Sequence, residues 1–149
     1  MAEAPRDGAA RRRDALARLE NDEDIWVASA SGDGEPYLVP LSFVWDGRRL
    51  TLATPEASPT GRNLMAARHV RLGLGPTRDV VMIDGDVEAF TRAAVPDDVA
   101  EAFAARRWDA RAESKPYGYF LVTPRVVQAW REENELRGRV IMRDGEWLV

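Results

Sequence analysis

The chain has 149 residues, a formal net charge of −4, 45% hydrophobic residues and no cysteine. This length predicts one domain over residues 1–149 with a buried core; the negative charge argues against a nucleic-acid binder, and the lack of cysteine excludes disulfides, thiolate metal sites and a cysteine nucleophile. No apolar run approaches the roughly 18 residues that span a membrane, and the N-terminus lacks the apolar region of a signal peptide, so we expect a cytoplasmic protein.

The N-terminal part is expected to form a short helix behind a disordered tail. Residues 1–8 are polar and include Pro5 and Gly8, so we expect them to be frayed. Residues 9–20 are rich in alanine, arginine and leucine, which predicts an amphipathic helix. We interpret the run Arg11–Arg13 as a solvated face of this helix.

An antiparallel meander is predicted next, with strands at residues 25–30, 37–45 and 49–54. Turn residues separate the strands: glycine and aspartate at 32–34, and then Asp46-Gly47, a strong hairpin signal. Pro40 lies inside the second strand, which indicates a bulge or an edge position.

The second half of the sequence continues the β pattern around further helices. Helices are predicted at residues 60–67 and 96–107, and strands at 70–74, 80–90, 117–122 and 126–130, followed by a closing hairpin or a tail over 139–149. About seven antiparallel strands with two to three short helices predict a mainly β protein, a small barrel that closes its own edges.

The start of the helix at residues 60–67 is a candidate anion site. Ser58 is a good N-cap and Pro59 suits the first helical position. Helix starts attract phosphate through free N–H groups and the helix dipole, and Thr60, Arg62 and Asn63 add further donors. The alternative is an ordinary capped helix with a surface arginine.

The catalytic inventory of the sequence is small. His69 is the single histidine, no Gly-x-Ser-x-Gly motif occurs, and we predict no metal site. Trp26 and Trp45 are expected in the core, whereas Trp108 is either a lid over a site or an anchor for its loop. Such a small number of acid–base groups is consistent with a protein in which a bound cofactor carries out the chemistry.

At this point two segments resemble a known family. The run W-V-A-S-A-S-G-D-G-E-P-Y-L-V-P-L-S-F-V-W-D-G and the helix start S-P-T-G-R-N-L, in this order and spacing, resemble the pyridoxamine 5'-phosphate oxidase-like split β-barrel superfamily. The likeness covers residues 25–130. It implies an antiparallel split β-barrel and a homodimer with two cofactors at the subunit interface.

The resemblance also implies which residues hold the cofactor. A flavin-type ring would be lined by Pro40, Leu41 and Ser42, and met by backbone groups of Leu52, Ala53 and Thr54. The phosphate would be held by Ser58, Thr60, Arg62 and Asn63. Trp130 and Arg131 resemble a pair that reaches the cofactor of the partner. Many relatives carry lysine or arginine where Thr60 stands, so Arg62 is expected to supply most of the compensating charge.

The function implied is a flavin- or deazaflavin-dependent oxidoreductase that uses FMN or coenzyme F420 on a small-molecule substrate. We do not expect vitamin B6 oxidation, because the sequence ends at Val149 without the C-terminal region of the true oxidases. A groove for the anionic tail of F420 would be lined by Arg48, Arg49 and Arg11–Arg13. The alternatives are a non-catalytic protein that stores or delivers flavin and a cofactor-free barrel that serves as an interaction module.

Overall fold

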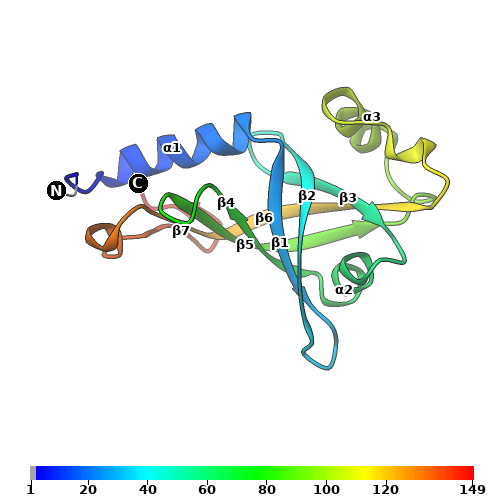
Figure 1. Ribbon diagram of the computed structural model, residues 1–149. Helices are drawn as coiled ribbons and strands as arrows, with labels where there is room; N and C mark the ends of the chain where they lie inside the picture. The colour runs from blue at the N-terminus through cyan, green and yellow to red at the C-terminus, as the bar shows by residue number, and fades with distance from the viewer. Residues whose placement is uncertain (1–2) are drawn as a thin grey trace.

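The computed structural model describes residues 3–149, which form three α-helices, two 3-10 turns and eight strands (Figure 1). In chain order the elements are α1 (Gly8–Asn21), β1 (Asp24–Ala30), β2 (Pro36–Trp45), β3 (Leu50–Pro55), α2 (Pro59–Ala67), β4 (His69–Leu74), β5 (Val80–Phe90), α3 (Asp97–Arg106), η1 (Ala110–Ala112), β6 (Tyr117–Trp130), η2 (Glu133–Glu135), β7 (Val140–Arg143) and β8 (Glu146–Trp147). No helix of this described range is long and apolar enough to cross a membrane.

Six strands close into an antiparallel barrel. The sheet runs in the order β3-β2-β1-β4-β5-β6, and β3 pairs again with β6, from Leu50 opposite Val122 to Pro55 opposite Tyr117. β7 and β8 extend the sheet beyond β6. Alternate residues point inward and form a core that includes fully buried Phe43, Leu72 and Phe120. The prediction of a small split β-barrel with a few helices is confirmed.

β6 corrects one predicted boundary. The separate strands expected at 117–122 and 126–130 are one continuous strand, and Pro124 lies within it opposite Gly85, where the β5–β6 register shifts. A Cβ on Gly85 would stand 2.4 Å from Val122 Cγ1. The missing side chain therefore lets β6 approach β5 closely at this point. Here β6 takes up one extra residue between Pro124 and Val126, Pro124 offers no N–H, and the strand continues.

The N-terminal segment is more firmly packed than expected. The disorder predicted for residues 1–8 does not hold from Arg6 onward, because the Arg6 side chain is 10% exposed and pairs with Glu135, while Gly8 already belongs to α1 and packs on Val149. The part of that prediction that concerns Met1 and Ala2 lies outside the described residues.

α1 also corrects the interpretation of its arginine run. Arg13 is exposed, but Arg11 is 5% exposed and donates to the backbone carbonyls of Glu135 and Arg137 at 2.9 and 3.3 Å. Arg12 lies over the ring of Trp147, 4.7 Å from its centroid. This face of the helix thus donates hydrogen bonds to backbone carbonyls of the turn after β6. Without them, these carbonyls would need water as a partner.

The two expected core tryptophans differ. Trp45 is buried, as predicted, but Trp26 is 51% exposed on the outside of the barrel. On β1 the neighbours of Trp26, Ile25 and Val27, are the inward residues, so strand alternation places Trp26 outside.

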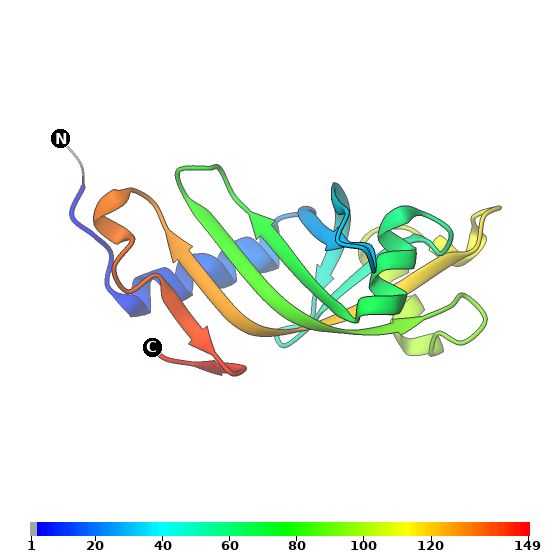
Figure 2. The ribbon, with the colours of Figure 1, turned by 90° about the horizontal axis from the view of Figure 1, so that it is seen from below.

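The helices and the C-terminal hairpin divide the molecule into two ends (Figures 1 and 2). The start of α1, the η2 turn and the β7–β8 hairpin gather at one end of the barrel, and α2 and α3 lie at the other. The long β1–β2 hairpin projects beyond the barrel on the side of α2 (Figure 1).

Candidate functional site

A gap opens in the barrel between β2 and β3. The two strands pair only where Phe43–Trp45 meets Leu50–Leu52. Farther along, β2 continues to pair with β1 through Pro40, and β3 continues to pair with β6 through Pro55. Their facing edges therefore have no strand partner across the gap, and Pro40 sits on such an edge, as predicted. Backbone donors and acceptors on these edges are available to a ligand.

A cavity of about 360 Å³ lies at this gap. Its lining is mostly neutral, and consists of Asp24, Pro40, Leu41, Ser42, Ala53, Thr54, Pro55, Trp108 and Tyr117. Sequence analysis had placed five of these residues, Pro40 to Ser42 with Ala53 and Thr54, around a flavin-type ring. The structure brings these five together.

Three lining residues were missed by sequence analysis: Asp24, Pro55 and Tyr117. Asp24 reads as an ordinary polar residue before a strand, and only the register opposite Ser42 reveals its position. The Ser42 hydroxyl donates to Asp24 Oδ1 at 3.0 Å. Tyr117 enters from the start of β6, opposite Pro55, a pairing between strands that are distant in sequence.

Trp108 forms one wall of the cavity and packs against two other aromatic rings. Its ring packs edge-on against Phe103 at 5.2 Å and against Tyr117 at 6.0 Å between centroids. Such T-shaped pairs are favourable beyond the area that they bury. Trp108 therefore anchors its loop and lines the cavity at the same time.

The start of α2 follows directly from β3 and is internally capped. The Ser58 hydroxyl accepts from the Gly61 N–H at 3.0 Å and donates its proton to the Pro55 carbonyl at 2.8 Å. A Cβ on Gly61 would stand 2.3 Å from the Pro55 carbonyl oxygen, so glycine is needed for this close approach. Since its single proton is used, Ser58 positions the helix start rather than offering a donor to a ligand.

The other residues predicted to hold the phosphate differ in which hydrogen-bonding groups are still available to a ligand. One N–H of the Asn63 side-chain amide donates to the Ser29 hydroxyl at 3.0 Å, which ties α2 to β1. Arg62 is exposed, and one of its guanidinium nitrogens donates to the Ala57 carbonyl. The Thr60 hydroxyl is buried and has no hydrogen-bond partner within the described chain. A buried polar group without a partner indicates a position that a bound group or an ordered water completes.

Besides the four residues at the start of α2, three further predicted residues do not line the cavity. Leu52 is fully buried, and its backbone lies in the ladders with Phe43 and Phe120. Trp130 and Arg131 are at the far end of β6, so one chain does not bring them to the gap (Figure 1). Likewise, the arginines suggested for an F420 tail do not line the cavity.

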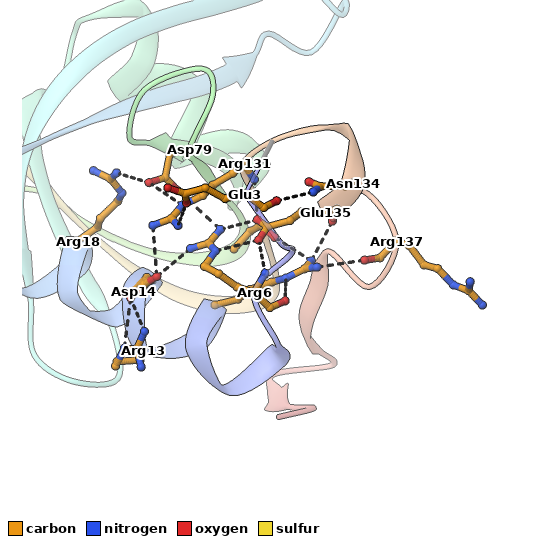
Figure 3. A network of polar contacts seen from close by, with 12 residues as sticks. Glu3, Arg6, Arg13, Asp14, Arg18, Asp79, Arg131, Asn134, Glu135 and Arg137 are labelled. Atoms are coloured by element: carbon orange, nitrogen blue, oxygen red, sulfur yellow. Dashed lines mark hydrogen bonds and ion pairs between the residues drawn. The ribbon is translucent and has the colours of Figure 1, made fainter. Parts of the chain in front are cut away.

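Arg131 belongs instead to a polar network at the opposite end of the barrel (Figure 3). Glu135, with its side chain 2% exposed, accepts from the Arg6 guanidinium at 2.8 and 3.1 Å and from the backbone N–H groups of Arg6 and Arg131. Arg131 also lies 3.4 Å from Asp79 and 3.6 Å from Asp14. The hydrogen bonds from Arg6 outweigh burial and lower the pKa of Glu135 to about 2.

The residues at the gap fit a planar ring joined to a phosphate. Unpaired strand edges and the apolar Pro40, Leu41 and Trp108 suit a flat heterocycle. The helix start, the orphaned Thr60 hydroxyl and Arg62 suit an anion. Arg62 is the one cation in α2, so its charge would supply most of the compensation for an anion at the helix start.

Comparison with known proteins supports the same family. The sequence profile of the family described as pyridoxamine 5'-phosphate oxidase matches residues 13–131. Among curated proteins, none matches the chain by sequence.

Several solved structures share the fold. General Stress Protein 26 from Bacillus anthracis str. Sterne has a TM-score of 0.65 at 16% identity, over 81% of this chain and 95% of its own. A structure described as an F420 reductase has a TM-score of 0.57 at 19% identity, over 74% of this chain and 93% of its own. HutZ, the heme storage protein from Vibrio cholerae, has a TM-score of 0.64 at 11% identity, over 80% and 94%. At these identities the likeness shows a common fold.

Proposed function

Because the chain belongs to the pyridoxamine 5'-phosphate oxidase family, we propose that it is an oxidoreductase that binds FMN or coenzyme F420 at the gap between β2 and β3. The observation that carries the proposal is the divergence of these two strands at Pro40–Ser42 and Ala53–Thr54, which leaves two unpaired edges around a cavity of about 360 Å³.

The ring would lie along these edges. Backbone groups of Ala53 and Thr54 that lack a β2 partner would hydrogen-bond its polar rim, and Pro40 and Leu41 would cover its face. The phosphate would sit at the start of α2, where the helix dipole and Arg62 attract an anion and the Thr60 hydroxyl gains a partner.

The bound coenzyme would supply the hydride-transfer chemistry, and the chain would position the ring and the substrate and shield them from water. The Trp108 wall and the mostly apolar residues around it would exclude water from the ring and hold a substrate against it. Asp24 is the one carboxylate in the lining and no histidine lines the cavity, so a Ser–His–Asp triad has no place in the proposed reaction.

A homodimer completes this proposal. Trp26 stands in register with Pro40 on β2 and Gly73 on β4, and Gly73 stands in register with Met82 on β5, so these residues share the outer face of the barrel. Leu38 on the same face is 61% exposed. Large exposed apolar side chains on one face mark an interface.

A two-fold dimer through this face would also explain how Trp130 and Arg131, which lie far from the gap in their own chain, could contribute to a site. Trp130 is opposite Val80, two residues along β5 from Met82. In an isologous dimer the same patch meets itself, so Trp130 and Arg131 of one copy can approach the gap of the other. The small molecule would then react within a site built from both copies.

The test is a fluorescence and thermal-shift titration of the purified protein with FMN, FAD and F420, together with its mass by light scattering. We expect tight binding of FMN or F420, a mass of twice 16.6 kDa, and oxidation of the reduced bound coenzyme by an added acceptor. The Leu38→Asp variant should become monomeric and bind the coenzyme more weakly. Failure of all three coenzymes to bind overturns the proposal, and tight binding without turnover supports the alternative of a flavin storage protein.

A further inference from the structure

The cavity at the gap contains one charged side chain. Asp24 is exposed at the start of β1, and its carboxylate accepts one hydrogen bond, from the neutral Ser42 hydroxyl. No cation pairs with it within the described residues. The cavity therefore presents an uncompensated negative charge to whatever enters.

The arginines on the segments around the cavity are already committed. Arg107 donates to the carbonyls of Phe43 and Asp22 at 2.9 and 3.2 Å, and Arg111 pairs with Asp109 through two hydrogen bonds. None of these guanidinium groups lines the cavity. A carboxylate or phosphate on the substrate would thus be desolvated without a countercharge, which is costly.

Arg131 of a second copy would do little to neutralise the negative charge of Asp24 in the cavity. Its guanidinium lies within 4 Å of carboxylates on Asp79, Asp14 and Glu3, at 3.4, 3.6 and 3.9 Å. It would arrive at the gap with its charge largely compensated.

We infer that the substrate is an organic cation, a protonated amine or a cationic heteroaromatic, and that Asp24 determines this preference. The inference rests on the proposed function, because substrate and ring must be in contact and so share this cavity. Trp108 and Tyr117 form an aromatic wall that favours a cation electrostatically, and Asp24 pairs with its charge at the rim.

The test measures charge preference directly with three probes of similar size: benzylammonium, benzyl alcohol and benzoate. Binding is followed by tryptophan fluorescence and calorimetry, in the free protein and in the protein loaded with FMN. We expect benzylammonium to bind roughly tenfold more tightly than benzoate. Asp24→Asn should abolish this preference, whereas Glu23→Gln, the same charge change one residue outside the lining, should retain it.

Two results overturn the inference: benzoate binding as tightly as benzylammonium, or a preference that survives Asp24→Asn in a variant whose melting temperature shows that it is folded. The free protein separates this inference from the proposed function. Loss of FMN binding with an Asp24-dependent preference refutes the coenzyme and not the cavity. FMN binding without the preference refutes the cationic substrate alone.

Discussion

The two ends of the barrel treat polar groups in opposite ways. At the end with η2, four hydrogen bonds converge on the buried Glu135, and arginines and carboxylates are interlocked (Figure 3). At the end with α2, two strand edges are unpaired, the Thr60 hydroxyl has no partner in the described chain, and Asp24 lacks a countercharge. At the first end the polar groups are paired within the chain, and at the second end several of them lack a partner in the described chain.

This difference separates stability from binding. Groups that are fully paired within the chain contribute to folding and offer little to a ligand, whereas unpaired groups cost stability until a ligand completes them. The polar network around Glu135 is thus structural, and the gap, with its unpaired edges and the uncompensated Asp24, is the better candidate for function.

The strongest test of the comparison removes the centre of the network. Glu135→Ala leaves the Arg6 guanidinium partly buried without its main partner, so we expect the free energy of unfolding to fall by about 3–5 kcal/mol, measured by urea denaturation. Coenzyme affinity in the folded variant should be unchanged. Glu133→Ala, an exposed neighbour, serves as the control and should cost little; a loss below about 1 kcal/mol for Glu135→Ala would contradict a structural role for the network.

The same carboxylate predicts a pH dependence. Its folded pKa of about 2 lies below the ordinary 4.5, so its stabilisation is complete above pH 4.5 and is lost as the pH falls toward 2. The difference in unfolding free energy between wild type and Glu135→Gln should therefore shrink by roughly 3 kcal/mol across this range. A difference that stays constant with pH would show that the ion pair is not its source.

At the other end, Arg62→Ala should affect binding and spare folding. Loss of the charged hydrogen bond to phosphate is expected to weaken FMN or F420 binding by roughly 1.5–3 kcal/mol, measured by fluorescence titration. The urea midpoint should move little, because Arg62 is exposed. Arg143→Ala, an exposed arginine on β7, is the control, and equal affinity in both variants would remove Arg62 from the phosphate site.

The smallest expected effect is that of Thr60→Val, which should raise the stability of the free protein and lower its affinity for the coenzyme. Thr60→Val removes a buried hydroxyl that lacks a partner in the described chain and keeps the volume, so the free protein should gain about 1 kcal/mol of stability. Coenzyme affinity should fall. Thr51→Val on β3 provides the control. A variant that loses stability would show that the hydroxyl is satisfied within the free protein.

Local patterns predicted most of the fold. The apolar runs of β1 and β2, the alternation in β3 and β5, the Asp46-Gly47 turn and the Ser58-Pro59 cap each depend on neighbouring residues, and the structure reproduces them. Pro40–Ser42 and Ala53–Thr54 were predicted from a resemblance to bind a ring, and the structure gathers them at one cavity.

The errors share a dependence on distant partners. Arg11 is buried because its acceptors are backbone carbonyls 124 and 126 residues away. Pro124 does not end a strand because the register with β5 shifts beside it, opposite Gly85, which has no side chain in the way. Asp24 joins the cavity through the β1–β2 register. No local pattern carries these relations, so sequence analysis could not anticipate them.

The pairing of β3 with β6 has a consequence for the order of folding. These strands are joined only after about sixty intervening residues have been made, so a nascent chain that stops before Tyr117 exposes open edges on both β3 and β5. Loop closure of this length slows the final step. We expect truncations within β6 to aggregate through those edges, and chaperones that bind extended segments to act before this strand emerges from the ribosome.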